Sequence, residues 1–170
     1  MRKAFTLIEL VVSIGILSII MIFLYKSYAS LNESNSFYKK EVSKIKSEQL
    51  KKKVLFLDFS LALQQNYKID IKPQDKKEDI VFLQSSNSMH NRYNPFIAYI
   101  FKEQKLYRLE SRNPFKDYPL SADADFSVEY FGEAKSFRVY KSENNATESY
   151  LIHVDFKEEE DVLLKVKVLG

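Results

Sequence analysis

The chain has 170 residues, of which 45% are apolar, and its 26 basic and 23 acidic side chains give a formal net charge of +3. This apolar share is ordinary for a folded protein, and so slight a positive balance gives no general attraction to nucleic acid, so no nucleic-acid partner is expected. The absence of cysteine excludes a fold held together by disulfides.

The first predicted element is an apolar helix behind a short basic start that contains Arg2 and Lys3. From Phe5 to Leu24 the only charged residue is Glu9. A helix of about 20 residues is about 30 Å long, which is enough to span a bilayer. A carboxylate within hydrocarbon costs roughly 2.5 to 3.5 kcal/mol on insertion scales, so such a residue is normally functional and has a partner. Glu9 is therefore the first candidate functional residue.

The run from Lys3 to Leu10, with the sequence Lys-Ala-Phe-Thr-Leu-Ile-Glu-Leu, resembles the prepilin signature of type IV pilins and type II secretion pseudopilins. The resemblance implies that prepilin peptidase cuts after Ala4, where the family usually has glycine, and methylates the amine of the new N-terminus at Phe5. It also implies that Glu9 pairs with the terminal amine of a neighbouring subunit, so that two buried opposite charges offset a desolvation cost that neither could bear alone. The alternative is that Glu9 lies at headgroup level near the start of the helix, where its negative charge interacts favourably with the helix dipole.

The apolar segment is predicted to stay in the product as an anchor. A secretory signal peptide has a shorter apolar core followed by a small-residue cleavage site. Here Tyr25, Lys26 and Tyr28 follow instead, which is typical of an interfacial collar. Lysines occur on both sides of the segment, so the resemblance decides the orientation. It implies a bacterial inner-membrane protein that crosses once, with a cytoplasmic N-terminus and a periplasmic or extracellular C-terminal domain.

Beyond the membrane the helix is expected to continue as an amphipathic stalk over residues 26–66. The stretch has no proline or glycine, and its apolar residues recur at intervals of three, four or seven. Asn32 to Ser36 is its weakest helical stretch and the expected place for a kink. The stalk lysines are interspersed with glutamates, which favours a solvated helix face over a basic binding patch.

The C-terminal part changes to a period of two, which predicts strands with one buried face. About eight strands are expected, with short hairpins at Glu103–Lys105, Gly132–Lys135 and Glu158–Asp161. The predicted fold class is α+β, with a long N-terminal helix packed on a C-terminal antiparallel sheet, as in pilins. The predicted division is a leader over 1–4, a transmembrane or filament-core helix over 5–25, the stalk over 26–66 and a globular β-rich domain over 67–170.

The order of the later elements also resembles that of the J-type minor pseudopilin and its type IV pilus counterpart. A helical stretch from Gln49 to Gln65 contains Asp58, and a hairpin from Ile97 to Leu109 follows it. This resemblance implies a place near the tip of a pseudopilus or pilus, in a complex with other minor subunits.

Catalytic and metal-binding patterns are weak. The two histidines, His90 and His153, would need nearby acids to hold zinc, and Ser121–Asp125 is a weak calcium pattern that reads better as a polar loop. Asn145-Ala146-Thr147 is interpreted as a turn, and the three glycines are scattered, so no phosphate loop is present. We predict no enzyme, no metal site and no cofactor.

The sequence therefore predicts a minor pilin or pseudopilin subunit whose partners are prepilin peptidase, other pilin or pseudopilin subunits and the inner membrane. Two alternatives stay open. One is a pilus-associated binding subunit, an adhesin or DNA-uptake pilin, and the more remote one is a signal-anchored periplasmic enzyme. Secretion, twitching and competence systems are not distinguished.

Overall fold

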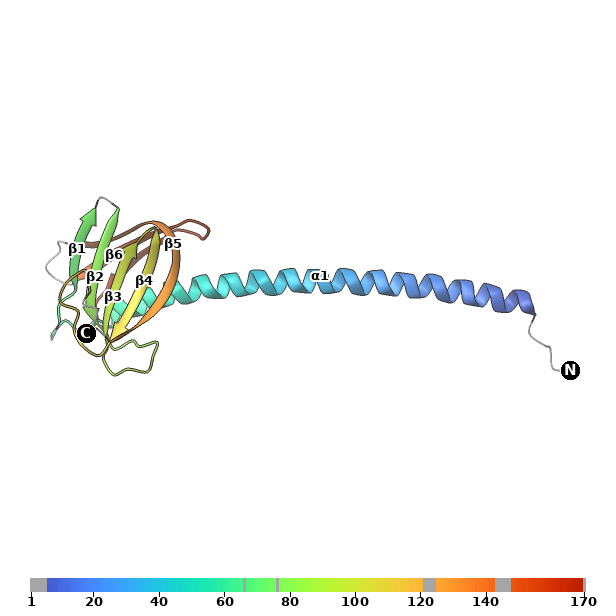
Figure 1. The fold of residues 1–170 in the computed structure, drawn as a ribbon, viewed down its shortest axis with the longest axis horizontal. Helices are drawn as coiled ribbons and strands as arrows, with labels where there is room; N and C mark the ends of the chain where they lie inside the picture. Colours follow the sequence, from blue (N-terminus) through green and yellow to red (C-terminus); the bar gives the residue numbers. More distant parts are fainter. Residues whose placement is uncertain (1–5, 66, 76, 121–124, 143–147, 170) are drawn as a thin grey trace. The chain divides into compact units, whose positions relative to one another are not determined.

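The computed structural model describes residues 6–65, 67–75, 77–120, 125–142 and 148–169, and it places one long helix before a β-sheet. The chain divides into two compact units, Met1–Ser47 and Glu48–Gly170, and helix α1 (Leu7–Ser60) belongs to both (Figure 1). The predicted α+β class is confirmed. The strands are β1 (Asp70–Asp75), β2 (Glu78–Gln84), β3 (Phe96–Lys102), β4 (Lys105–Ser111), β5 (Phe126–Lys141), β6 (Ser149–Phe156) and β7 (Val162–Lys167).

Helix α1 is uninterrupted from Leu7 to Ser60, so the kink expected at Asn32–Ser36 is wrong. The hydroxyl of Ser36 donates to the Glu33 carbonyl at 2.8 Å, which satisfies this polar side chain within the helix. The helix ends at Ser60 rather than near residue 66. There the backbone N–H of Leu169 donates to the Ser60 carbonyl at 2.8 Å, and Ala62 forms a β-bridge with Ser85. Tertiary partners therefore end the helix, because they take over backbone groups that a further turn would need.

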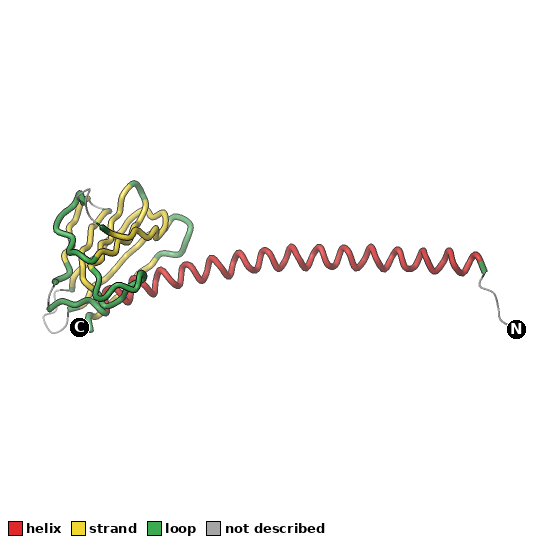
Figure 2. Tube along the Cα trace, turned by 60° about the horizontal axis from the view of Figure 1, so that its bottom comes forward, coloured by secondary structure: helices red, strands yellow, loops and turns green. Residues whose placement is uncertain are grey.

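The last turns of α1 and one face of the sheet form the main core of the unit Glu48–Gly170. Val54, Leu55 and Phe59 from the helix are buried against strand residues. Phe59 contacts the rings of Tyr99 and Tyr150, with ring centroids 6.1 and 6.0 Å apart. The strand residues of this core come from β2 to β7. In Figure 2 the strands, in yellow, lie close together and are joined by loops, in green.

The seven strands form one sheet in the order of the sequence, and each pairs antiparallel with the next. One further, parallel pairing joins β2 to β5, between Glu78 and Phe137. The sheet therefore curls until its fifth strand returns to its second. The predicted hairpins at 103–105 and 158–161 are confirmed, since β3 pairs with β4 and β6 with β7 across them.

Strands β2, β3 and β4 are buried on both faces, which the alternating pattern did not predict. A second apolar cluster lies on the face away from the main core. Phe115, from the loop after β4, covers this face and stacks on Phe82 with centroids 6.0 Å apart. Because the loop shields the outer face, β2 and β3 carry nearly continuous apolar runs, at residues 80–83 and 96–101.

The predicted hairpin at Gly132–Lys135 is wrong, because these residues lie inside the single strand β5. The first half of β5 pairs with β4 and the second half with β6, with register shifts near Leu106 and Ala134. Gly132 has a φ of +136°, a conformation that favours glycine. The glycine therefore bends one strand instead of reversing the chain, and the described residues contain seven strands instead of eight.

Candidate assembly site and buried ion-pair network

The N-terminal part of α1 is apolar around its whole circumference. An 18-residue window in this helix has a mean hydropathy of 2.8, and none of the window is buried. The helix is long and apolar enough to cross a membrane. Its two serines are satisfied locally, because Ser13 donates to the Glu9 carbonyl at 2.7 Å and Ser18 to the Ile14 carbonyl at 2.8 Å. Glu9 is thus left as the one charged side chain of the span.

Glu9 forms a capping box with Thr6 at the start of α1. The backbone N–H and the hydroxyl of Thr6 both donate to Glu9 Oε2 at 2.9 Å, and the backbone N–H of Glu9 donates to Thr6 Oγ1 at 3.4 Å. This is the reciprocal pattern of a Thr-x-x-Glu motif. The carboxylate therefore has a local role in starting the helix. Oε1 has no hydrogen-bond partner among the residues that the structure describes.

The capping geometry agrees with the alternative interpretation of Glu9, in which the acid favours the helix start. It does not test the charge pair with a neighbouring subunit, which stays a prediction. Ala4 and Phe5, the predicted cleavage and methylation residues, lie outside the described residues. So do residues 121–124 of the weak calcium pattern and the turn at 145–147.

Residues 1–25 match the family described as the prokaryotic N-terminal methylation motif. The chain carries a prepilin-type methylation motif. This match supports the type IV pilin and pseudopilin family and processing by prepilin peptidase, and the family is structural rather than enzymatic. It reaches only the N-terminal segment, so it does not separate secretion from pilus systems or identify a J-type subunit. Neither the search of curated proteins nor that of solved structures gave a match.

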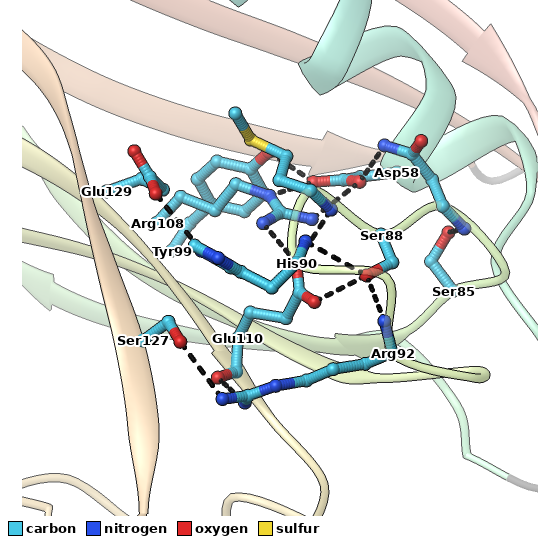
Figure 3. Close-up of polar contacts among 12 residues, drawn as sticks. Asp58, Ser85, Ser88, His90, Arg92, Tyr99, Arg108, Glu110, Ser127 and Glu129 are labelled. Carbon is cyan, nitrogen blue, oxygen red and sulfur yellow. Dashed lines mark hydrogen bonds and ion pairs between the residues drawn. The ribbon is translucent and has the colours of Figure 1, made fainter.

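In the globular unit of this prepilin-type chain, a buried ion pair joins α1 to the sheet (Figure 3). Asp58 and Arg108 are both fully buried. Arg108 Nε donates to Asp58 Oδ2 at 2.7 Å and Nη2 to Oδ1 at 3.2 Å. The hydroxyl of Tyr99 donates to Oδ2 at 2.6 Å, and Asn87 Nδ2 donates to Oδ1 at 2.6 Å. Each of the two buried carboxylate oxygens of Asp58 therefore accepts two hydrogen bonds, so neither is left unsatisfied.

A second carboxylate, Glu110, extends this network to the loop between β2 and β3. Arg108 Nη1 donates to Glu110 Oε2 at 2.9 Å, the Ser88 hydroxyl donates to Oε1 at 2.6 Å, and the backbone N–H of Met89 donates to Oε2 at 3.0 Å. Arg92 donates to the Glu110 carbonyl and, at 2.9 Å, to the Ser127 hydroxyl. The network thus fastens the loop to β4 and β5.

The network shifts the ionisation of its members. Burial raises the pKa of Asp58. The charge of Arg108 and the hydrogen bonds from Arg108, Tyr99 and Asn87 oppose this rise. Burial acts against the charged form of Arg108, but Asp58 outweighs it and raises the pKa of the guanidinium. Burial also acts against ionised Glu110, but hydrogen bonds from Ser88, Arg108 and Met89 lower the pKa of this carboxyl below its ordinary value.

The predicted helix at Gln49–Gln65 contains Asp58 and the predicted hairpin at Ile97–Leu109 contains Arg108, but the two residues were not predicted to pair. Two signals were available. Asp58 occupies the same helix face as Leu55 and Phe59, and Arg108 and Glu110 continue the buried alternation that begins at Leu106. A charged residue in a core position is normally paired, so each of these positions calls for a partner.

The histidines do not come together. His90 lies 3.0 Å from Glu129 in an ion-pair geometry, whereas His153 is on β6 opposite Arg138. Among the described residues, no group of three or more His, Asp or Glu side chains is arranged to hold a metal ion.

Proposed function

We propose that this chain is a minor pilin or pseudopilin subunit that prepilin peptidase cuts between Ala4 and Phe5 and methylates at Phe5. It then assembles through its N-terminal helix into a type II secretion pseudopilus or a type IV pilus, at the tip. The observation that carries the proposal is the methylation motif at residues 1–25 on a helix whose apolar side chains are exposed. Such a helix needs a membrane or the helices of other subunits around it.

The proposed division follows from the same segment. Residues 1–4 are the removed leader, residues 5–25 lie in the inner membrane and later in the filament core, and α1 then continues as a stalk. The N-terminus is cytoplasmic, and the C-terminal domain faces the periplasm or the exterior. The proposed partners are prepilin peptidase and other pilin or pseudopilin subunits.

Glu9 is the proposed counter-charge for the methylated amine of Phe5 in a neighbouring subunit. The described part of the chain offers Glu9 no cationic partner, and its Oε1 is free to accept further hydrogen bonds. In a water-free filament core, an ammonium group would offset the desolvation of the carboxylate.

The capping box allows the charge of Glu9 to be tested apart from its role in the helix. Glu9→Gln removes the charge but keeps a side chain that suits a capping box, whereas Thr6→Ala weakens the cap and keeps the charge. We expect Glu9→Gln to stay in the membrane and to be lost from sheared filaments, while Thr6→Ala is incorporated. Normal incorporation of Glu9→Gln would contradict the charge-pair mechanism.

Processing is tested by mass spectrometry of the N-terminal peptide from membranes with and without prepilin peptidase. The expected product begins at N-methylated Phe5 and depends on the peptidase. A peptide that begins at Met1 in both samples would overturn the proposed assembly route.

A further inference from the structure

An exposed apolar seam runs along α1 in the unit Met1–Ser47 and has no partner among the described residues. Its members recur alternately every three and four residues, as positions a and d of a heptad do. Outside the membrane segment the side chains of Leu31, Tyr38 and Ile45 are 69%, 71% and 50% exposed. The a positions are Leu7, Ile14, Met21, Tyr28, Asn35 and Val42, and the d positions are Leu10, Leu17, Leu24, Leu31, Tyr38 and Ile45.

We propose that this seam pairs α1 with α1 of a second copy of the chain in a parallel, in-register, two-stranded coiled coil. Because α1 is unbroken through Asn32–Ser36, the heptad phase is kept from the membrane segment into the stalk. In water, pairing would bury the stalk part of the seam, from Tyr28 to Ile45, whose side chains are exposed in the single helix except for the half-buried Val42.

The residue types along the seam favour two strands. Four successive d positions, from Leu10 to Leu31, are leucine, and the a positions include β-branched Ile14 and Val42. Leucine at d with β-branched residues at a is the combination that favours parallel dimers. Asn35 at an a position would face the same residue of the second copy, and one such buried asparagine specifies register and two strands.

The charges that flank the stalk seam give the direction of pairing. Along the seam, positions e hold Lys39 and Lys46, and position g holds Glu41. In a parallel pair, each g residue lies beside the e residue five positions later in the other helix. Glu41 then meets Lys46 in both directions. An antiparallel pair would place lysine beside lysine and glutamate beside glutamate, which is repulsive.

These charges are available for a second helix. Within the described ranges, Glu41 and Lys46 have no ion-pair partner. The seam ends where the globular unit begins. Lys52, at the d position after Ile45, forms an ion pair with Glu160 of that unit at 3.4 Å. Phe59, one heptad later, is buried in the core of that unit. The pairing surface is therefore limited to the part of α1 that ends at Ile45.

The inference does not rest on the proposed filament function. Glu9 occupies a c position, away from the seam, so pairing leaves its carboxylate accessible. In a heterologous filament contact, a residue does not face its own copy, whereas in a parallel in-register dimer it does. Self-contact of seam residues thus distinguishes the two arrangements.

The absence of cysteine allows a direct test by single-cysteine disulfide cross-linking of the full chain. The chain would be expressed in membranes of a host without prepilin peptidase or other pilins and oxidised with copper phenanthroline. We expect disulfide-linked dimers for Leu31→Cys and Val42→Cys and none for Lys40→Cys and Ser47→Cys, which occupy f positions on the opposite face. Equal cross-linking on both faces, or none at the seam, would overturn the proposal.

A charge reversal checks the direction of pairing in the Val42→Cys background. Lys46→Glu would place two glutamates together and reduce the dimer, and adding Glu41→Lys would restore it. The control Glu33→Lys, at an f position, should leave the dimer unchanged. Failure of the double variant to restore cross-linking would contradict the parallel arrangement. Because the assay needs no cleavage and Glu9→Gln should behave as wild type in it, its result is independent of the filament experiment.

Discussion

Removing the charge of Asp58 is the most informative perturbation of the globular domain. Asp58→Asn keeps the size of the side chain and one oxygen acceptor, so it opens no cavity. It leaves the buried guanidinium of Arg108 with Glu110 as its remaining carboxylate partner, through Nη1 at 2.9 Å. The two bonds from Arg108 to Asp58, at 2.7 and 3.2 Å, lose the charge of their acceptor.

The expected loss of stability follows from these contacts. Breaking one side of a buried ion pair typically costs about 3 to 5 kcal/mol. Because Glu110 still balances Arg108 and the asparagine oxygen still accepts a hydrogen bond, we expect a value near the lower end, about 3 kcal/mol. The double variant Asp58→Leu with Arg108→Met removes both charges of the pair, and Glu110 keeps its hydrogen bonds from Ser88 and Met89. The double variant should be more stable than Asp58→Leu alone.

The assay is urea unfolding of the full chain in detergent micelles, followed by the near-ultraviolet circular dichroism of its 11 tyrosines. Lys52→Gln is the matched control, because it breaks a helix-to-loop ion pair with Glu160, whose side chain is 84% exposed. Exposed pairs contribute about 1 kcal/mol or less. If Asp58→Asn behaved like this control, or if the Asp58 and Arg108 variants were additive, the network would not hold the helix to the sheet.

Two further predictions concern the sheet. The lowered pKa of Glu110 stabilises the fold above the ordinary glutamate range near pH 4.5, and this contribution is lost as the pH falls through the folded pKa. Glu110→Gln should therefore be less stable at pH 7. Its free energy of unfolding, measured by urea titration, should fall less steeply than that of the wild type between pH 6 and 3. Gly132→Ala should lower the urea midpoint, because φ is +136° and the added Cβ would lie 3.3 Å from the Phe156 ring. Such strain costs about 1 to 3 kcal/mol of folding stability. An unchanged midpoint would contradict the bent β5.

Local sequence patterns were sufficient to predict several of the secondary-structure elements. The apolar run after Phe5 and the lack of proline predicted the long helix, and alternation predicted the strands that became β6 and β7. These features depend on residues close in the chain, whose periodicity directly reports which face meets water. The hairpin between β3 and β4 was found for the same reason, since a short polar connection separates two apolar runs.

The errors fall where distant residues decide the outcome. Gly132 looked like a turn, but β4 and β6 pair with successive halves of one strand and make it a bend. The helix stops at Ser60 because Leu169, from the other end of the chain, takes the Ser60 carbonyl. Neither contact leaves a signal in the neighbouring sequence, because each joins residues that are far apart along the chain.

Short-range spacing and hydropathy encode the helix that is long and apolar enough to cross a membrane, the methylation motif at residues 1–25 and the α+β class, so these could be predicted from the sequence. The contact between Asp58 of the helix and Arg108 of β4 depends on how the chain folds. They lie 50 positions apart, and the residues between them carry no pattern that specifies which buried charges become partners. Burial makes an unpaired charge costly, but the fold of the sheet decides which opposite charge lies within reach.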